Sequence, residues 1–276
     1  MARRVAFLGP VGTYTEDAAL KYDPEADLQP FPSIVAVGLA VTSGVTDQGV
    51  VPIENSLEGS VTFTLDLLIS QSGLSICNEI VVPIDHVLLA KSGTRAPEVQ
   101  VVYSHPQGLA QCREFLERCL PQAEQRASLS TVACITDMLE SSVTAAAISP
   151  RRAATLYDVE IIGQNIQDSP NNVTRFAVLD KSDHAPTGND KTSLCFSFDQ
   201  DAPGSLYGAL VEFAKRDINL VKIESRPTKE SLGRYIFLID CEGHREDPLV
   251  KEAIEALEST VSALKIWGSY PKWDGA

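Results

Sequence analysis

Hydroxyl, guanidinium and aromatic side chains follow one another at Thr174-Arg175-Phe176, directly after two asparagines. On a strand, alternate residues face opposite sides of the sheet, so Thr174 and Phe176 are expected on the same side. Arg175 could then bind a carboxylate from an adjoining position, since a guanidinium forms two parallel hydrogen bonds with it. A surface strand that carries an ordinary arginine is the alternative explanation.

The segment Glu54-Asn55-Ser56 follows an apolar run, Gly49–Ile53, that predicts a buried strand. Three polar side chains at a strand end could donate and accept hydrogen bonds to a ligand. The alternative is a turn that only leads the chain away from the strand.

Ser104-His105-Pro106-Gln107 follows a second apolar run, Val99–Tyr103, and opens a helical pattern in which Gln111 lies one turn later. The free amides and the positive dipole end of a helix favour anions. Ser104 is expected to cap this helix. His105 could donate a proton, although a lone histidine is more often structural.

A glycine-rich segment, Gly9-Pro10-Val11-Gly12-Thr13, follows the first apolar run, and Thr13 and Glu16 have the spacing of a capping box. The segment has neither the GxGxxG pattern nor the lysine of a phosphate loop. It is therefore expected to form a strand-to-helix turn, whose amides could still face an anion. No Ser–His–Asp order in the chain indicates a hydrolase triad.

Two short segments in the last third of the chain are candidates for binding an amino acid. Gly204-Ser205-Leu206 is expected to begin a helix, and Glu224-Ser225-Arg226-Pro227 to end a strand. The charges of Glu224 and Arg226 could hold an ammonium and a carboxylate, or could simply be solvated at the strand end. Gly208-Ala209-Leu210 is predicted to be a packing surface inside the same helix.

The elements that must position these residues alternate between short apolar runs and helical patterns over the first two thirds of the chain. Such alternation predicts an α/β architecture with a largely parallel sheet, in which ligands lie beyond the carboxyl ends of the strands. Strands are expected at Val5–Leu8, Gly49–Ile53, Val99–Tyr103, Ala145–Ile148 and Val173–Leu179, and helices after Thr13, at Ser33–Val41, Val61–Ile69, Leu109–Leu120 and Thr131–Leu139, and after Pro150.

A polar segment that contains proline and glycine, Lys181–Lys191, is predicted to be a linker between two domains. The remaining residues predict the order βαββαβ, which is the ferredoxin-like plan. Its strands are expected at Thr192–Phe198, Leu220–Ser225, Tyr235–Cys241 and Ala263–Trp267, and its helices at Gly204–Arg216 and Pro248–Leu257.

The 276 residues include 23 Lys and Arg against 37 Asp and Glu, for a net charge of −14. This balance argues against nucleic acid and anionic membranes as partners, although a small anion could bind in a locally positive cleft. The six cysteines form no CxxC pair and are expected to be reduced thiols of a cytoplasmic protein. No apolar run approaches the length of a membrane span, and the first one is too short for a signal sequence.

Taken together, the segments resemble a prephenate dehydratase followed by an ACT regulatory domain. The residues that carry the resemblance occur in the family's order across nearly the whole chain. They are Gly9 to Tyr14, Pro52-Ile53-Glu54-Asn55-Ser56, Ser104-His105-Pro106-Gln107 with Gln111-Cys112, Thr174-Arg175-Phe176 and Glu224-Ser225-Arg226-Pro227.

The resemblance implies a fold and a reaction. Two α/β lobes related to periplasmic binding proteins would form a catalytic domain over residues 1–183, with crossings between lobes near residues 78 and 160. An ACT domain would span residues 191–276. The reaction converts prephenate to phenylpyruvate, carbon dioxide and water, a step towards phenylalanine. Aromatisation drives it, so neither a cofactor nor a metal is expected.

Residue by residue, the resemblance implies a catalytic Thr174, with Arg175 and Phe176 completing the signature. The residues that it implies for substrate binding, together with their polar neighbours, are Asn55, Glu54, Ser56, Ser104, Gln107, Gln111 and Thr13. The effector phenylalanine would bind at Gly204, Ser205, Leu206, Glu224, Ser225 and Arg226. Ser205 departs from the family's usual alanine, and a homodimer or homotetramer is expected.

Two other functions remain open at this point. Arogenate dehydratase performs the same chemistry on a substrate with an amine in place of the side-chain keto group. A non-enzymatic cytoplasmic sensor would need the same binding cleft without a catalytic Thr174.

Overall fold

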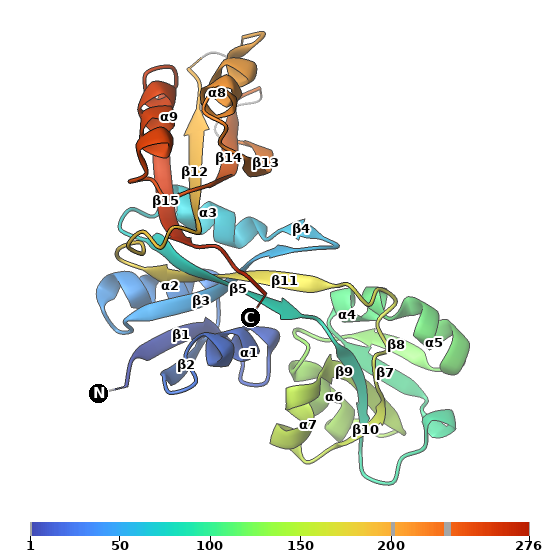
Figure 1. Ribbon diagram of the computed structural model, residues 1–276. Helices are drawn as coiled ribbons and strands as arrows, with labels where there is room; N and C mark the ends of the chain where they lie inside the picture. Colours follow the sequence, from blue (N-terminus) through green and yellow to red (C-terminus); the bar gives the residue numbers. More distant parts are fainter. Residues whose placement is uncertain (1, 200–201, 229–232, 276) are drawn as a thin grey trace. The chain divides into compact units, whose positions relative to one another are not determined.

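The computed structural model describes residues 2–199, 202–228 and 233–275, whose strands form three sheets (Figure 1). The first sheet has the order β2-β1-β3-β11-β5, and a short strand, β4, pairs antiparallel with β3. β1 and β2 are parallel, with Arg4 opposite Asp27. Its strands are β1 (Arg4–Leu8), β2 (Asp27–Phe31), β3 (Gln48–Asn55), β4 (Gly59–Ser60), β5 (Ser75–Pro83) and β11 (Val173–Asp180), and its helices are α1 (Tyr14–Tyr22), α2 (Ile34–Ser43) and α3 (Thr62–Ser70).

The second sheet has the order β10-β6-β9-β7-β8, in which β7 is parallel to β8 and β9 while β6 is antiparallel to β9 and β10. Its strands are β6 (His86–Ala90), β7 (Val101–Ser104), β8 (Glu124–Ala127), β9 (Ala145–Pro150) and β10 (Glu160–Gly163). The helical segments between them are η1 (Ala96–Glu98), α4 (Pro106–Gln111), α5 (Arg113–Cys119), α6 (Ala133–Glu140) and α7 (Arg151–Tyr157).

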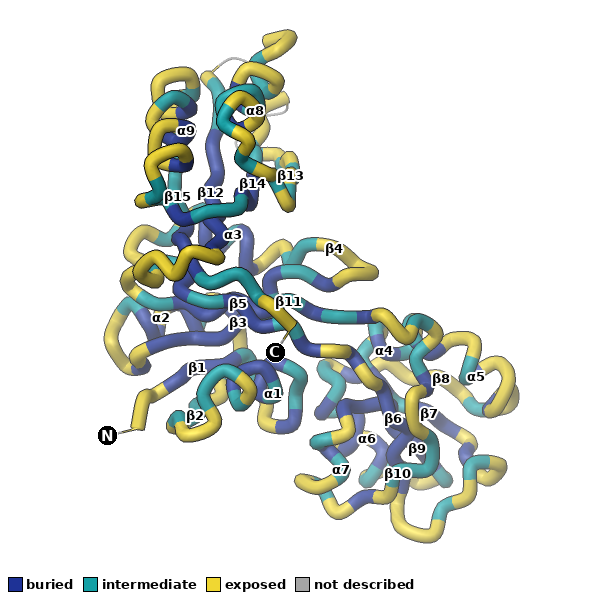
Figure 2. Tube along the Cα trace, in the orientation of Figure 1, coloured by how far each residue is buried: buried dark blue, intermediate teal, exposed yellow. Residues whose placement is uncertain are grey.

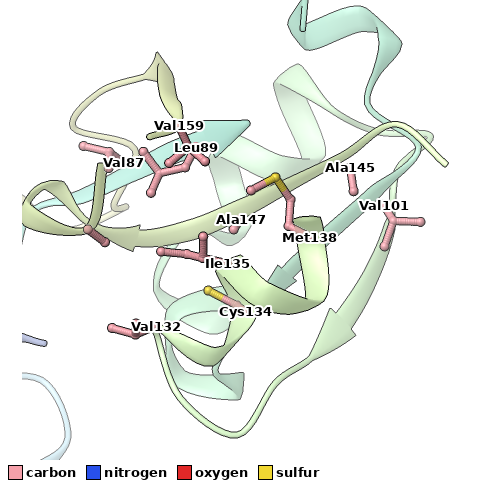
Figure 3. Close-up of a cluster of buried hydrophobic side chains, with 11 residues drawn as sticks. Val87, Leu89, Val101, Val132, Cys134, Ile135, Met138, Ala145, Ala147 and Val159 are labelled. Carbon is pink, nitrogen blue, oxygen red and sulfur yellow. The ribbon is translucent and has the colours of Figure 1, made fainter. Parts of the chain in front are cut away.

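Helices cover both faces of this second sheet. On one face, Cys134, Ile135 and Met138 of α6 pack with alternate residues of the strands (Figure 3). On the other face, Cys112 and Leu116 pack with the intervening strand residues. Every residue of β9 is buried, as expected for a strand that is covered on both sides. The predicted α/β architecture is therefore confirmed, but this sheet is mixed rather than largely parallel.

The third sheet is antiparallel and has the order β13-β14-β12-β15. Its elements are β12 (Asp190–Ser197), α8 (Ser205–Ala214), β13 (Leu220–Pro227), β14 (Tyr235–Glu242), α9 (Pro248–Glu258) and β15 (Ala263–Pro271), which confirms the predicted βαββαβ order. Phe213 of α8 and Leu257 of α9 pack with Leu194, Phe196 and Ile239 of the sheet. The strands β12 and β14 are largely buried along this contact, and the outer sides of both helices are exposed (Figure 2).

The chain divides into two compact units, formed by residues 1–33, 52–61 and 81–176 and by residues 34–51, 62–80 and 177–276. The second unit joins the third sheet to α3 and β5. Arg226 forms an ion pair of 3.1 Å with Asp66 of α3, and the Lys265 ammonium donates to carbonyls at the end of α3. Lys191 and Glu79 form a buried ion pair of 2.8 Å between β12 and β5.

One predicted helix was wrong. The single helix expected over Leu109–Leu120 is two helices, because the backbone leaves helical geometry at Cys112, with φ −119° and ψ 23°. Cys119, the last residue of α5, is exposed. The segment predicted as a linker, Lys181–Lys191, contains a local turn near its end, where the buried Asp190 carboxylate accepts hydrogen bonds from Thr187 and Gly188, and its role as a linker stays a prediction.

None of the helices in the described ranges is both long enough and apolar enough to span a membrane.

Candidate active site

The adjacent strands β3 and β11 bring Asn55 and Thr174 together. The Asn55 amide nitrogen lies 3.0 Å from the Thr174 hydroxyl oxygen and 2.7 Å from the Asn172 carbonyl oxygen, and it donates to both. Asn55 and Thr174 are only 7% and 8% exposed. Because the Thr174 oxygen accepts from Asn55, its own O–H is left to donate to another group.

The orientation of the Asn55 amide is fixed from its other end. Its carbonyl oxygen accepts from the backbone N–H groups of Leu57 and Glu58, at 3.0 and 3.1 Å. These two bonds form an Asx turn, which confirms the turn that was the alternative interpretation of this segment. If the Asn55 side chain were flipped, its NH₂ group would face the Leu57 and Glu58 N–H groups. The turn therefore keeps the side-chain nitrogen directed at Thr174.

A guanidinium lies on the other face of β11. Arg175 forms an ion pair of 3.0 Å with Glu54, and its side chain is only 13% exposed. This alternation of faces confirms that Thr174 and Arg175 point to opposite sides of the strand. Phe176 is 2% exposed and belongs to the buried interior. Ser56 joins the strands through its hydroxyl, which accepts from the Val173 N–H at 3.0 Å.

Gln111, the last residue of α4, extends the polar group that surrounds Asn55. Its amide nitrogen donates to the Glu58 carboxylate at 2.9 Å, and its carbonyl oxygen accepts from the Asn172 amide at 3.1 Å. Asn172 therefore connects Gln111 to Asn55. Asn172 is one of the two asparagines that precede Thr174 in the sequence, where no role was predicted for it, and it lies directly before β11.

The Ser104 side chain is turned away from this group. Its hydroxyl is fully buried and donates to the Ile148 carbonyl of β9 at 2.8 Å. The prediction that Ser104 caps the next helix was wrong, because the cap is His105, whose ring nitrogen accepts from the Gln107 N–H. That contact gives His105 the structural role that was the alternative to proton donation.

The capping box predicted at Thr13 and Glu16 is also wrong. The Thr13 hydroxyl donates to the carbonyls of Leu8 and Pro10 rather than capping the helix. The Glu16 carboxylate instead accepts from the Gly12 N–H at 2.6 Å and pairs with Arg152 at 2.9 Å. The Gly12 amide is therefore already occupied by a carboxylate of this chain.

The residues predicted to bind an effector lie on two elements of the third sheet's domain. Gly204 precedes Ser205 and Leu206 at the start of α8 and has a φ of +90°, which a residue with a Cβ rarely adopts. Glu224, Ser225 and Arg226 lie on β13. Within this unit Arg226 contacts both the Asp66 carboxylate and the Thr62 carbonyl of α3.

Neither a reactive thiol nor a metal cluster accompanies the site in the part of the chain that the structure describes. Burial, assisted by the nearby Asp168 carboxylate, raises the pKa of the Cys112 thiol to about 12, so it is un-ionised at neutral pH. Among residues 2–199, 202–228 and 233–275, no three His, Cys, Asp or Glu side chains gather in a way that could hold a metal ion.

Comparison with known families agrees with the order of the motifs. The family model of prephenate dehydratase matches residues 5–184, and that of the ACT domain matches residues 200–259. The fold and these matches define an α/β protein with a C-terminal ACT domain. The chain belongs to the prephenate dehydratase family.

Relatives cover nearly the whole chain. It is 44% identical over 270 residues to the bifunctional chorismate mutase/prephenate dehydratase of Aquifex aeolicus, which covers 98% of this chain and 74% of that protein. It is 38% identical over 282 residues to the prephenate dehydratase of Methanocaldococcus jannaschii, which covers 99% and 100% of the two chains.

Two solved structures share the fold. Prephenate dehydratase from Arthrobacter aurescens in complex with L-Phe has a TM-score of 0.92 and 36% identity, covering 99% of this chain and 91% of that one. GqqA, a quorum quenching acylase, has a TM-score of 0.88 and 28% identity, covering 99% of both chains. Because proteins of this fold have different named activities, the reaction must be argued from the site residues.

Proposed function

We propose that this chain converts prephenate to phenylpyruvate, carbon dioxide and water, with Thr174 as the proton donor. One observation carries the proposal: the buried Thr174 hydroxyl accepts from Asn55, which leaves its hydrogen for an incoming group. Prephenate carries a hydroxyl at ring carbon 4 that must depart, and hydroxide is a poor leaving group. A donor beside that oxygen lets it depart as water.

The electrons of the reaction balance without a redox partner. The bond between the ring and its carboxylate breaks, its electron pair enters the ring, and the bond to the 4-hydroxyl breaks as the ring becomes aromatic. Thr174 gives the departing oxygen a proton and regains one from solvent. A threonine hydroxyl is too weak an acid to ionise first, so the transfer is concerted, and general acid help of this kind contributes about 10²–10⁴-fold.

Arg175 was expected to bind a substrate carboxylate. Its guanidinium lies on the face of β11 opposite Thr174 and is paired with Glu54 at 3.0 Å. This arrangement supports a role in which Arg175 holds β11 beside β3 and so positions Thr174. Asn55 and Gln111 are the main proposed substrate residues, followed by Ser56 and Gln107. The Ser104 and Thr13 hydroxyls, which were expected to bind substrate, donate to backbone carbonyls instead.

Regulation by phenylalanine is the second part of the proposal. The ACT domain and the L-Phe complex of the Arthrobacter aurescens relative support it. Gly204, Ser205, Leu206, Glu224, Ser225 and Arg226 would form the binding site. We assign residues 1–183 to catalysis and 191–276 to regulation, and we expect a cytoplasmic homodimer or homotetramer.

The deciding experiment incubates the protein with prephenate and measures phenylpyruvate by its absorbance in alkali, with and without phenylalanine. Thr174→Ala should lower kcat far more than it changes KM, whereas Thr174→Ser should retain substantial activity. Equal activity in all three proteins would remove Thr174 from the mechanism. Faster turnover of arogenate than of prephenate would indicate an arogenate dehydratase, and binding without turnover would indicate a sensor.

A further inference from the structure

A buried histidine that belongs to none of the sequence motifs lies behind Gln111. His86 of β6 is 2% exposed. Its Nε2 lies 2.9 Å from the Gln111 carbonyl oxygen, and its Nδ1 lies 3.1 Å from the Tyr14 hydroxyl. The Tyr14 ring packs edge-on against the imidazole, with 5.7 Å between centroids. Hydrogen bonds thus reach the imidazole from α1 on one side and from α4 on the other.

The partners of Gln111 determine which imidazole nitrogen carries the hydrogen. The Glu58 carboxylate can only accept, so the Gln111 nitrogen must face it. The Gln111 oxygen then faces both Asn172 and His86, and His86 must donate from Nε2. Burial lowers the pKa of His86, although the Gln111 hydrogen bond and the Asp85 carboxylate oppose the change. The lowered pKa favours a neutral ring at pH 7 with its hydrogen on Nε2, while the Tyr14 hydroxyl beside Nδ1 donates to the Asp85 carbonyl at 2.8 Å.

The same hydrogen bonds lead from His86 to the proposed proton donor. Asn172, which is 1% exposed, donates to the Gln111 oxygen and accepts from Asn55. Asn55 in turn donates to Thr174. The partners of the Gln111, Asn172 and Asn55 side-chain amides fix which end of each amide is the oxygen and which is the nitrogen. If the Gln111 amide flipped, its nitrogen would face the Asn172 nitrogen, and the order would be lost along the series.

We propose that His86 is a positioning residue, which fixes the Gln111 amide and through Asn172 the Asn55–Thr174 pair. It touches neither substrate nor reacting atoms. Its effect is to leave one hydrogen of the Gln111 amide nitrogen for the substrate, because the other is bound to Glu58. The Tyr14 hydroxyl donates to the Asp85 carbonyl at 2.8 Å and lies 3.1 Å from Nδ1, so the Gln111 oxygen is the contact that holds the ring hydrogen on Nε2. The kinetic part of this proposal rests on the proposed function.

The kinetic test compares two substitutions of similar size. His86→Leu removes the donor and should lower kcat/KM for prephenate about tenfold to a hundredfold, mostly through kcat, since misplaced catalytic groups cost rate. His86→Gln can place an amide N–H near the position of Nε2 and should recover most of the loss. A matched control is His244→Gln in the ACT domain, where His244 is 1% exposed and bonded to the His184 carbonyl; it should keep wild-type activity.

A spectroscopic test is independent of the reaction. The chain has four histidines, so ¹⁵N-histidine labelling gives few signals, and the His86→Gln variant identifies that of His86. Long-range ¹H–¹⁵N spectra at pH 7 should show a neutral ring with hydrogen on Nε2. Tyr14→Phe should leave the hydrogen on Nε2, because the Gln111 oxygen accepts it.

The outcomes separate the two proposals. Hydrogen on Nδ1 in the wild-type protein overturns the assignment of His86, whatever the enzyme does. So does an active wild-type enzyme in which His86→Leu, at equal folded fraction, retains full activity, or in which His86→Gln is as damaged as His86→Leu. An inactive wild-type protein whose His86 carries hydrogen on Nε2 would refute the dehydratase and keep the positioning geometry. If His86→Leu fails to fold, His86→Gln and the spectra still decide.

Discussion

Replacing Asn55 with aspartate should disable the site while changing its shape very little. The new oxygen that corresponds to the Asn55 carbonyl would still accept from the Leu57 and Glu58 N–H groups, so the turn survives. The other oxygen would replace the donor that faces Asn172 at 2.7 Å and Thr174 at 3.0 Å. The Asn55 nitrogen donates to the Asn172 and Thr174 oxygens, and the new carboxylate oxygen would instead face these two acceptors.

The expected loss can be worked out from these contacts. The repulsion between these oxygens is reduced only if Thr174 turns its O–H towards the new carboxylate, and that turn removes the proton donor from the substrate. A general acid contributes about 10²–10⁴-fold, so Asn55→Asp should lower kcat by about that factor, or roughly 3–5 kcal/mol in the barrier. The buried charge should also reduce stability by about 1–3 kcal/mol.

The pH dependence gives this prediction its sharpest test. Burial raises the pKa of a carboxylic acid above its usual value, and the protonated acid regains a donor at the position of the lost N–H. Turnover of prephenate by Asn55→Asp, relative to wild type, should therefore rise as the pH falls from 8 to 5. The matched control is Asn171→Asp, which adds the same charge at a nearby exposed residue. It should lose much less activity, through KM, by repulsion of the dianion.

Two results would refute the reasoning. One is an Asn55→Asp enzyme whose kcat stays within tenfold of wild type with a parallel pH profile. The other is an equal loss in Asn171→Asp, because then general repulsion rather than the contact with Thr174 would explain the effect. Melting temperatures measured at both pH values would show whether loss of folding contributes.

Three further predictions concern residues outside that contact. Burial raises the pKa of Asp17 to about 6, with Arg152 opposing and Glu16 assisting the change, so protonated Asp17 stabilises the fold below pH 4 and this stabilisation is lost as the pH rises through 6. Asp17→Asn should therefore stabilise the protein at pH 7.5 by about 1–2 kcal/mol, after allowance for solvent screening, and should not stabilise it at pH 3.5. Denaturant melts at the two pH values measure this difference. Asp66→Asn removes the ion-pair partner of Arg226 and should lower the half-inhibitory concentration of phenylalanine about fivefold, whereas Arg226→Ala should raise this concentration. If both variants shift it in the same direction, the ion pair has no role in inhibition. Lys265→Met removes the donor to the end of α3 and should lower the melting temperature by several degrees, corresponding to about 1–3 kcal/mol, with Lys251→Met on the exposed side of α9 as control.

Buried strands with strong apolar runs could be predicted from the sequence, and exposed ones could not. β3 and β9 are almost wholly buried, so their valine, isoleucine and alanine runs gave a clear signal. β8 consists of Glu124–Ala127, with all four residues exposed, and lacks any apolar pattern. β2 contains Pro30, which argues against a strand although an edge position tolerates it.

The site was predictable to the extent that its residues lie in short segments next to strand ends. Asn55 and Thr174 could be proposed from such segments, and their contact then depends on the pairing of β3 with β11. His86 could not be found, because a histidine in an apolar strand has no pattern that distinguishes a hydrogen-bonding role from packing. Ser104 was misassigned as a cap because β7 continues through it, which directs its hydroxyl at β9.

The ion pairs and hydrogen bonds that join the third sheet to α3 and β5 limit where chimeras of this protein can be divided. The most obvious place to exchange ACT domains is the polar segment before β12. A junction there would separate the Lys191 ammonium from the Glu79 carboxylate, which is 3% exposed, and Lys265 from the carbonyls at the end of α3. A transplanted domain should therefore be chosen for a lysine at each of these two positions, or moved together with α3 and β5 as one cassette.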